Sequence, residues 1–159
     1  IFRGKIGEFF IHRNIANLVP SYNSVKKNDD TYSMLEYAVS GLKIKKIIIL
    51  GHSNCGGIYF AFKKFSGKIS NENYSFLNNY IETIKSAYQS IDKNNSEKEC
   101  IKSLEKMSIV KSLNNLNEFP LFNNLIKKKE LKIYGLWFEI KSGKLMLYND
   151  ENKKFENII

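Results

Sequence analysis

The fold is decided by residues 46–57, which read KIIILGHSNCGG. The first half of this stretch, Lys46–Gly51, carries four consecutive aliphatic residues, which is typical of a strand buried on both faces of a parallel sheet. The glycine-containing turn that follows leads into a helix predicted over Ile58–Phe65. Upstream, Thr31–Leu42 places apolar residues at helical spacing, with Asp29 or Asp30 available as N-cap.

A short apolar strand is expected further upstream, at Glu8–His12. With the helix Thr31–Leu42 and the strand Lys46–Gly51 it makes a strand, helix, strand unit, and such units build parallel sheets.

The remaining chain supplies helices and a closing pair of strands. We expect a long polar helix over Tyr74–Ile91, a helix over Glu97–Asn117, a short helix after Pro120, a strand over Leu131–Ile140 and an antiparallel strand over Lys144–Tyr148. The buried face of the Glu97–Asn117 helix is expected to carry Ile101, Leu104, Met107, Val110 and Leu113. The predicted fold class is therefore α/β, a mostly parallel sheet flanked by helices on both faces, with an antiparallel edge strand. Residues 1–159 are expected to form a single domain.

Composition excludes several classes of protein. A chain of 159 residues with 43% hydrophobic residues can bury a core, and its apolar runs are too short to span a membrane. The net charge is +9, but only Arg3 and Arg13 among the 25 basic residues are arginines, so we expect no nucleic-acid partner. The two cysteines allow at most one disulfide, which favours a reducing, cytoplasmic setting.

The residues that carry chemistry lie in the turn Gly51–Gly57. His52 and Cys55 are three positions apart where the strand ends, the edge at which open α/β sheets bind ligands. An imidazole nitrogen and a thiolate are both zinc ligands, at about 2.0–2.3 Å. The glycines add free backbone N–H groups at a helix N-terminus, which favours an anion. Taken alone, this pair is weak evidence for a metal site, and a packed histidine beside a buried thiol is the favoured interpretation.

Three motifs in register resemble those of the β-class carbonic anhydrases. They are Arg13-Asn14-Ile15-Ala16-Asn17, Leu35-Glu36-Tyr37-Ala38-Val39 and Gly51-His52-Ser53-Asn54-Cys55-Gly56-Gly57. The resemblance continues through Val110–Leu116 and Leu131–Tyr148, and it covers nearly the whole chain.

The resemblance implies a zinc enzyme that interconverts carbon dioxide and bicarbonate. The family holds its metal with two cysteines and one histidine, and His52 and Cys55 match two of these three ligands. The other cysteine belongs to a C-x-D-x-R motif that precedes the equivalent of Ile1. The chain is therefore expected to be a domain that lacks its N-terminal strand and helix, with no complete catalytic set and no activity of its own.

The same resemblance assigns a substrate pocket and an assembly. Phe10, Ile15 and Tyr37 match residues that line the family's pocket, and Gly56 matches one whose backbone N–H faces the bound anion. Packing in the core is the alternative for these side chains. Family members are dimers or dimers of dimers, which implies a homodimer or homotetramer. The alternative function is a non-catalytic relative that binds an anion or a metal, and a basic nucleic-acid-associated domain is a weaker third.

Overall fold

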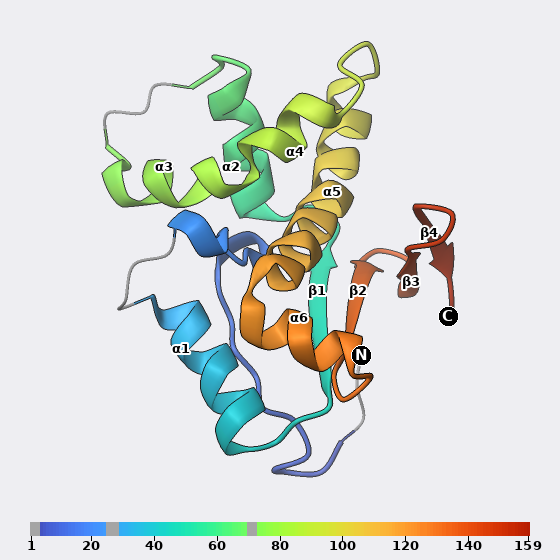
Figure 1. Cartoon of the computed structure of the whole chain (residues 1–159). Helices are drawn as coiled ribbons and strands as arrows, with labels where there is room; N and C mark the ends of the chain where they lie inside the picture. Colours follow the sequence, from blue (N-terminus) through green and yellow to red (C-terminus); the bar gives the residue numbers. More distant parts are fainter. Residues whose placement is uncertain (1–3, 25–28, 70–72) are drawn as a thin grey trace.

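The computed structural model describes residues 4–24, 29–69 and 73–159 (Figure 1). Its strands are β1 (Lys46–His52), β2 (Lys132–Glu139), β3 (Lys144–Asn149) and β4 (Lys154–Asn157). Its α-helices are α1 (Asp30–Glu36), α2 (Gly56–Phe65), α3 (Ser75–Ile81), α4 (Lys85–Ser90), α5 (Glu97–Glu118) and α6 (Pro120–Lys127). Shorter helical turns lie at Ile15–Asn17, Tyr22–Ser24, Tyr37–Gly41 and Glu82–Ile84.

The strands of the described residues form one mixed sheet in the order β1-β2-β3-β4. Strands β1 and β2 are parallel, with Ile49 opposite Gly135, and the pairs β2–β3 and β3–β4 are antiparallel. The predicted α/β class and the antiparallel return of Lys144–Tyr148 are confirmed. Helices α2, α3 and α4 gather beyond the end of β1, and α6 lies before the start of β2 (Figure 1). No helix of the described segments is long and apolar enough to cross a membrane.

One face of β1 is covered and the other is partly open. Ile47 and Ile49 pack with side chains of α1, α5 and α6, whereas Ile48 between them is 39% exposed. The prediction that this strand is buried on both faces is therefore wrong for the described residues. Because successive side chains of a strand point to opposite faces, a layer over Ile47 and Ile49 cannot cover Ile48.

Helix α5 is the central element of the core. Ser96 and Glu99 form a capping box at its start, and it packs against α2, α4, α6 and both β1 and β2. Leu104 and Leu113 are buried as predicted, whereas Ile101, Met107 and Val110 are only half-buried. The buried positions include polar residues instead, namely Glu105, Ser108, Ser112 and Asn115.

Two other sequence predictions are wrong. Glu8–His12 is not a strand, because no strand of the described sheet lies beside it to pair with its backbone. The helix expected over Tyr74–Ile91 is divided into α3 and α4 by the 3₁₀ turn Glu82–Ile84. In a 3₁₀ turn residues three apart lie directly above each other, and both Ile81 and Ile84 are fully buried there.

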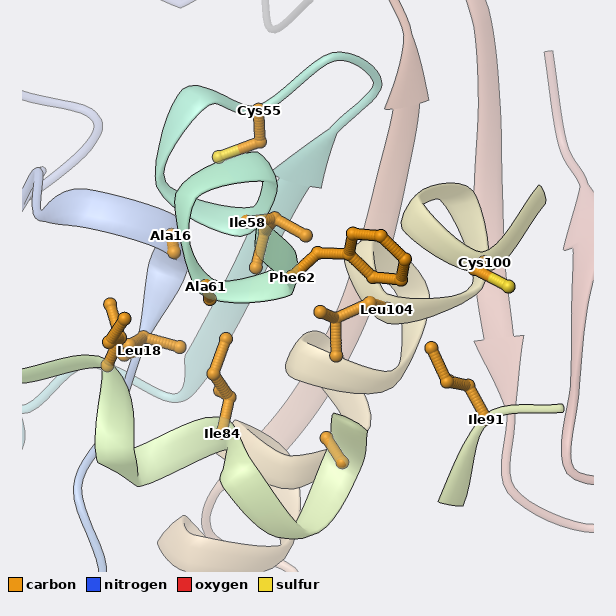
Figure 2. Packing of buried hydrophobic residues seen from close by; sticks show 12 residues of the cluster. Ala16, Leu18, Cys55, Ile58, Ala61, Phe62, Ile84, Ile91, Cys100 and Leu104 are labelled. Carbon is orange, nitrogen blue, oxygen red and sulfur yellow. The ribbon is translucent and has the colours of Figure 1, made fainter. Parts of the chain in front are cut away.

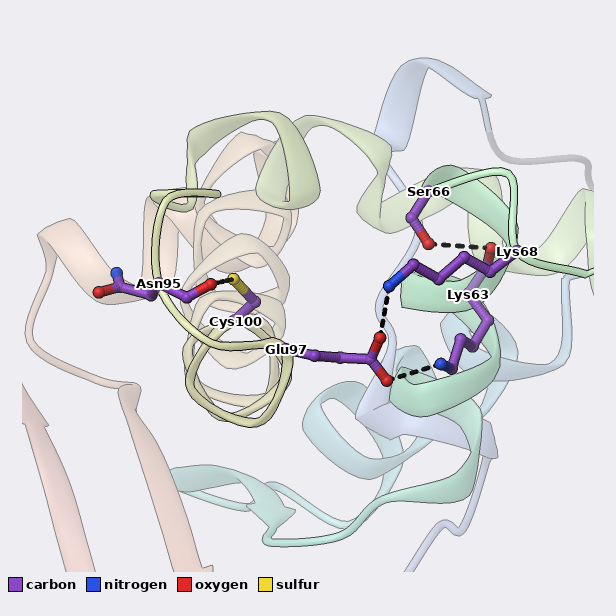
Figure 3. A network of polar contacts seen from close by, with 6 residues as sticks. All are labelled: Lys63, Ser66, Lys68, Asn95, Glu97 and Cys100. Carbon is purple, nitrogen blue, oxygen red and sulfur yellow. Dashed lines mark hydrogen bonds and ion pairs between the residues drawn. The ribbon is translucent and has the colours of Figure 1, made fainter.

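A charged cluster joins α2 to α5. Glu97, in the first turn of α5, accepts hydrogen bonds from Lys63 Nζ and Lys68 Nζ, each at 2.6 Å (Figure 3). These bonds hold the pKa of the Glu97 carboxyl below its usual range. Because the first-turn carboxylate also complements the helix dipole, the cluster stabilises both the start of α5 and its contact with α2.

Candidate metal centre

The loop that carries His52 and Cys55 is fastened to the end of β2. The Ser53 N–H donates to Phe138 O at 2.9 Å, and the Ile140 N–H donates to Ser53 Oγ, also at 2.9 Å. Ser53 is buried, so these bonds are protected from water. The loop therefore leaves the sheet in a defined direction, at the carboxyl ends of the two parallel strands.

His52 is the last residue of β1 and its side chain is exposed. Its Nδ1 lies 3.0 Å from Ser53 O. Because a carbonyl oxygen only accepts hydrogen bonds, this contact requires the proton on Nδ1. A neutral imidazole of that tautomer keeps its lone pair on Nε2, the arrangement found in histidines that bind metals.

Cys55 directly precedes α2 and occupies its N-cap position. It is a free, buried cysteine at the edge of a core cluster that includes Ala16, Ile58 and Ala61 (Figure 2). Asn54 before it adopts the left-handed conformation at φ 57°, which asparagine tolerates better than most residues. This turn brings the chain from the end of the strand into the helix within three residues.

The donor set of this loop fits zinc in kind but supplies only two ligands. An imidazole nitrogen and a cysteine sulfur are both common protein ligands of zinc. A catalytic zinc site, however, needs at least three protein ligands. In residues 4–24, 29–69 and 73–159, no group of three or more His, Cys, Asp or Glu side chains could hold a metal ion.

Two of the predicted pocket residues, Ile15 and Gly56, lie at the first turn of α2. Ile15 is half exposed, and it lies so close to the helix that a Cβ on Gly57 would be 2.5 Å from its Cγ2. Gly57 is therefore required by this close approach. Gly56 is exposed, and a Cβ there would meet nothing within 4 Å. The first turn of α2 thus has a side wall at Ile15 and open space at Gly56.

The other two predicted pocket residues contact each other. The rings of Phe10 and Tyr37 lie 6.0 Å apart between centroids, and about half of each side chain is exposed. Tyr37 begins the π-helical turn that follows α1. Phe10, Ile15 and Tyr37 are therefore not fully buried in the core of this chain.

The segment that carries Ile15 is held by polar side chains of α5. Ser112 accepts from the Val19 N–H at 3.1 Å and donates to Asn17 O at 2.9 Å, and Asn115 Nδ2 donates to Val19 O at 2.6 Å. Ala16 and Asn17 are left-handed, at φ 62° and 50°. These bonds hold the Ile15 wall against the first turn of α2, and the apolar pattern of α5 did not predict them.

A buried carboxylate beneath the loop was also missed from the sequence. Glu105, on α5, accepts from the Cys55 N–H at 3.3 Å through Oε1 and from Trp137 Nε1 at 3.2 Å through Oε2. Burial raises the pKa of the Glu105 carboxyl, while the N–H donors of Cys55, Trp137 and Asn54 oppose that rise. An acidic residue beside Leu104, on the expected buried face of a helix, was the available signal.

Comparison with known proteins gives one consistent result. The family model described as carbonic anhydrase matches residues 1–145. A carbonic anhydrase of Candida albicans is 30% identical over 157 residues, which cover 96% of this chain and 52% of that protein. Beta carbonic anhydrase 3 of Arabidopsis thaliana is 31% identical over 154 residues, covering 93% and 58%.

Solved structures agree on the fold. The β-carbonic anhydrase CcaA superimposes with a TM-score of 0.88 at 22% identity, covering 96% of this chain and 73% of that one. A tetrameric β-carbonic anhydrase of Sordaria macrospora gives a TM-score of 0.71 at 26% identity, covering 90% and 69%. This chain spans about half to three fifths of the length of the two curated relatives named above.

Proposed function

This chain belongs to the β-class carbonic anhydrase family, and we propose that its protein catalyses the zinc-dependent, reversible hydration of carbon dioxide to bicarbonate and a proton. The observation that carries the proposal is the loop Gly51–Gly57. It places an imidazole with a bonded Nδ1 and a free cysteine on either side of one turn, at the ligand-binding edge of the sheet.

His52 and Cys55 are proposed to bind the zinc ion, through Nε2 and Sγ. A third protein ligand is needed, and we place it outside these 159 residues, as the family's C-x-D-x-R cysteine. When bound, zinc supplies the Lewis acidity that lowers the pKa of a coordinated water to about 7. The protein's own task is to fix the ligands, exclude bulk water and admit a small apolar substrate.

The residues around the loop suit that task. Ile15 supplies an apolar wall beside the first turn of α2, and Gly56 leaves open space in that turn. A helix N-terminus attracts anions through its unpaired N–H groups, so the Gly56 N–H is proposed to face bicarbonate. Phe10 and Tyr37 are proposed to form the far side of the pocket, where their exposed rings keep it apolar.

We further propose that the protein works as a homodimer or homotetramer. The Sordaria macrospora relative is described as tetrameric. This chain has four apolar or aromatic side chains that are about half exposed or more, namely Phe10, Ile11, Ile15 and Tyr37. The first three lie close together in sequence, and the ring of Tyr37 contacts that of Phe10. Sedimentation velocity of the protein tests this assembly, and a monomer at micromolar concentration would contradict it.

A cytoplasmic location is proposed on weaker grounds. Both cysteines are free thiols, which a reducing compartment preserves. The Arabidopsis relatives include proteins named as chloroplastic and mitochondrial, so the compartment needs its own test. Fractionation of cells that produce the tagged protein provides it, and recovery in an organelle fraction would refute the proposal.

The decisive experiment compares two cysteine variants. The protein is produced from its complete coding sequence without chelators, and its zinc content and carbon dioxide hydration are measured. Cys55→Ser should lose zinc and activity together, because a serine hydroxyl stays protonated and is a poor zinc ligand. Cys100→Ser is the matched control, because Cys100 is also buried, lies on α5, and donates hydrogen bonds from Sγ to the backbone carbonyls of Asp92 and Asn95 rather than to the loop.

Three outcomes separate the alternatives. Zinc and activity that both depend on Cys55 support the enzyme. Zinc that depends on Cys55, without hydration activity, favours the non-catalytic metal-binding module. Absence of zinc from the unsubstituted protein refutes both.

A further inference from the structure

The carboxylate of Glu105 connects a backbone donor and a side-chain donor beneath the proposed zinc loop. Oε1 accepts the Cys55 N–H, Oε2 accepts the Trp137 indole N–H, and the backbone N–H of Asn54 helps to lower the pKa of the same carboxylate. Glu105 is 3% exposed and Trp137 is 1% exposed, so water competes little for these bonds. The donors come from the loop after β1 and from β2, and the acceptor comes from α5.

We propose that Glu105 is a positioning residue, held by Trp137, that fixes the backbone of Asn54 and Cys55 for metal binding. This inference rests on the proposed zinc function of the loop. Asn54 is left-handed and Cys55 is extended, so the loop reverses its conformation between these two residues. A carboxylate that accepts the Cys55 N–H holds the chain directly after that reversal and sets the direction in which the Cys55 side chain leaves the backbone.

On the Cys55 side the Tyr59 N–H of α2 also donates to Cys55 O at 2.9 Å, but it is Glu105 that accepts the Cys55 N–H at the loop end of this residue. Ser53 fastens the loop to β2, but its bonds to Phe138 and Ile140 lie before the reversal. The Cys55 side chain makes no capping hydrogen bond to α2. Glu105 thus determines the position of one proposed ligand, and Ser53, with the Nδ1 contact, determines that of the other.

Trp137 determines which oxygen of Glu105 is available to the loop. A carboxylate accepts on both oxygens, whereas a glutamine amide accepts on one and donates from the other. In Glu105→Gln the amide must therefore turn an NH₂ either toward the indole N–H or toward the loop N–H groups. Removing the indole donor with Trp137→Phe frees the glutamine to turn its oxygen toward the loop.

The test is a double-mutant cycle measured on zinc affinity. Outer partners of metal ligands typically contribute 10–100-fold to metal affinity, and Glu105→Gln should weaken zinc binding by that factor in competition with a chromophoric chelator. Adding Trp137→Phe should restore most of the loss, even though the double variant loses packing at a fully buried position. Cys100→Ser is the control, because Cys100 is a buried residue of the same helix whose Sγ bonds to the backbone carbonyls of Asp92 and Asn95, away from the loop.

Amide hydrogen exchange of the metal-free protein gives an independent readout. Glu105→Gln should speed exchange at Asn54 and Cys55, Trp137→Phe should reverse that effect, and Cys100→Ser should leave both amides unchanged. If the Glu105 carboxylate only stabilised the fold, Glu105→Gln would lower the melting temperature, and adding Trp137→Phe would restore neither the zinc affinity nor the slow amide exchange. Unchanged zinc affinity in Glu105→Gln, or a double variant that binds zinc as weakly as the single one, overturns the inference. If the unsubstituted protein binds no zinc, the proposed function fails, and the exchange data still decide whether the network positions the loop.

Discussion

The two neighbouring glycines at the start of α2 should respond in opposite directions to alanine. A Cβ added at Gly57 would lie 2.5 Å from Ile15 Cγ2 and 3.2 Å from Ala16 Cβ, whereas one at Gly56 would meet nothing within 4 Å. Overpacking of a fitted contact costs about 1–3 kcal/mol, and replacing a helical glycine by alanine returns up to about 1 kcal/mol. Gly57→Ala should therefore lower the free energy of unfolding by about 1–2 kcal/mol.

Gly56→Ala is the matched control, with the same substitution one residue away. It should leave stability unchanged or raise it by up to about 1 kcal/mol. Urea unfolding of both variants measures the difference, which should also appear as a melting temperature lower by about 2–8 °C for Gly57→Ala than for the unsubstituted protein. Equal stability of the two variants would show that the Ile15–Ala16 segment does not press against the start of α2.

Three other predictions concern the proposed pocket and the charged cluster around Glu97. Ile15→Phe should block hydration activity while the zinc content stays unchanged, because Ile15 is half exposed at the proposed pocket; unchanged activity would remove it from the pocket. Tyr37→Ala should lower the free energy of unfolding in urea by about 1–2 kcal/mol, less than the ~3–5 kcal/mol typical of buried aromatic residues, because Tyr37 is 57% exposed. Tyr37→Phe should leave this free energy almost unchanged, because it keeps the ring that contacts Phe10. Lys63 and Lys68 lower the pKa of Glu97 in the folded protein. The ionised carboxylate therefore stabilises the fold above the ordinary glutamate pKa, and this stabilisation is lost as the pH falls through the lowered pKa of the folded state. Glu97→Gln should therefore lower the melting temperature at pH 7 but not near pH 2, and an equal loss at both would contradict the charged cluster.

The elements that could be predicted from the sequence are those whose signals are local. The apolar run of β1, the N-cap Asp29 of α1 and the turn between β2 and β3 each lie within a few residues of the element they define. The candidate ligands His52 and Cys55 were found for the same reason, since the turn that carries them is continuous in sequence. Their assignment to zinc depended on the resemblance of three motifs rather than on their spacing.

The features that were missed depend on partners distant in the chain. Glu8–His12 has the composition of a strand, but a strand requires a neighbour with free backbone groups, and the described sheet offers none beside it. The polar positions of α5 are buried because they bond to segments about 50 to 95 residues upstream. Strand β4 has little apolar patterning, and it forms because β3 presents an edge next to it.

The burial of the proposed pocket residues could not be predicted for a related reason. Their helical or strand-like spacing indicates an apolar face, and it does not say whether that face meets the core, a pocket or another subunit. The structure shows that three of these residues are about half exposed, namely Phe10, Ile15 and Tyr37. Leu35 and Val39, in the same region of the sequence, are buried instead.

Anomalous scattering at the zinc absorption edge, from crystals of the complete protein, shows directly whether His52 and Cys55 bind one zinc ion. We expect one strong peak, about 2.3 Å from Cys55 Sγ and about 2.0–2.1 Å from Nε2 of His52, with Nδ1 still bonded to Ser53 O. A zinc peak away from Cys55, or bound to His52 through Nδ1, would contradict this assignment.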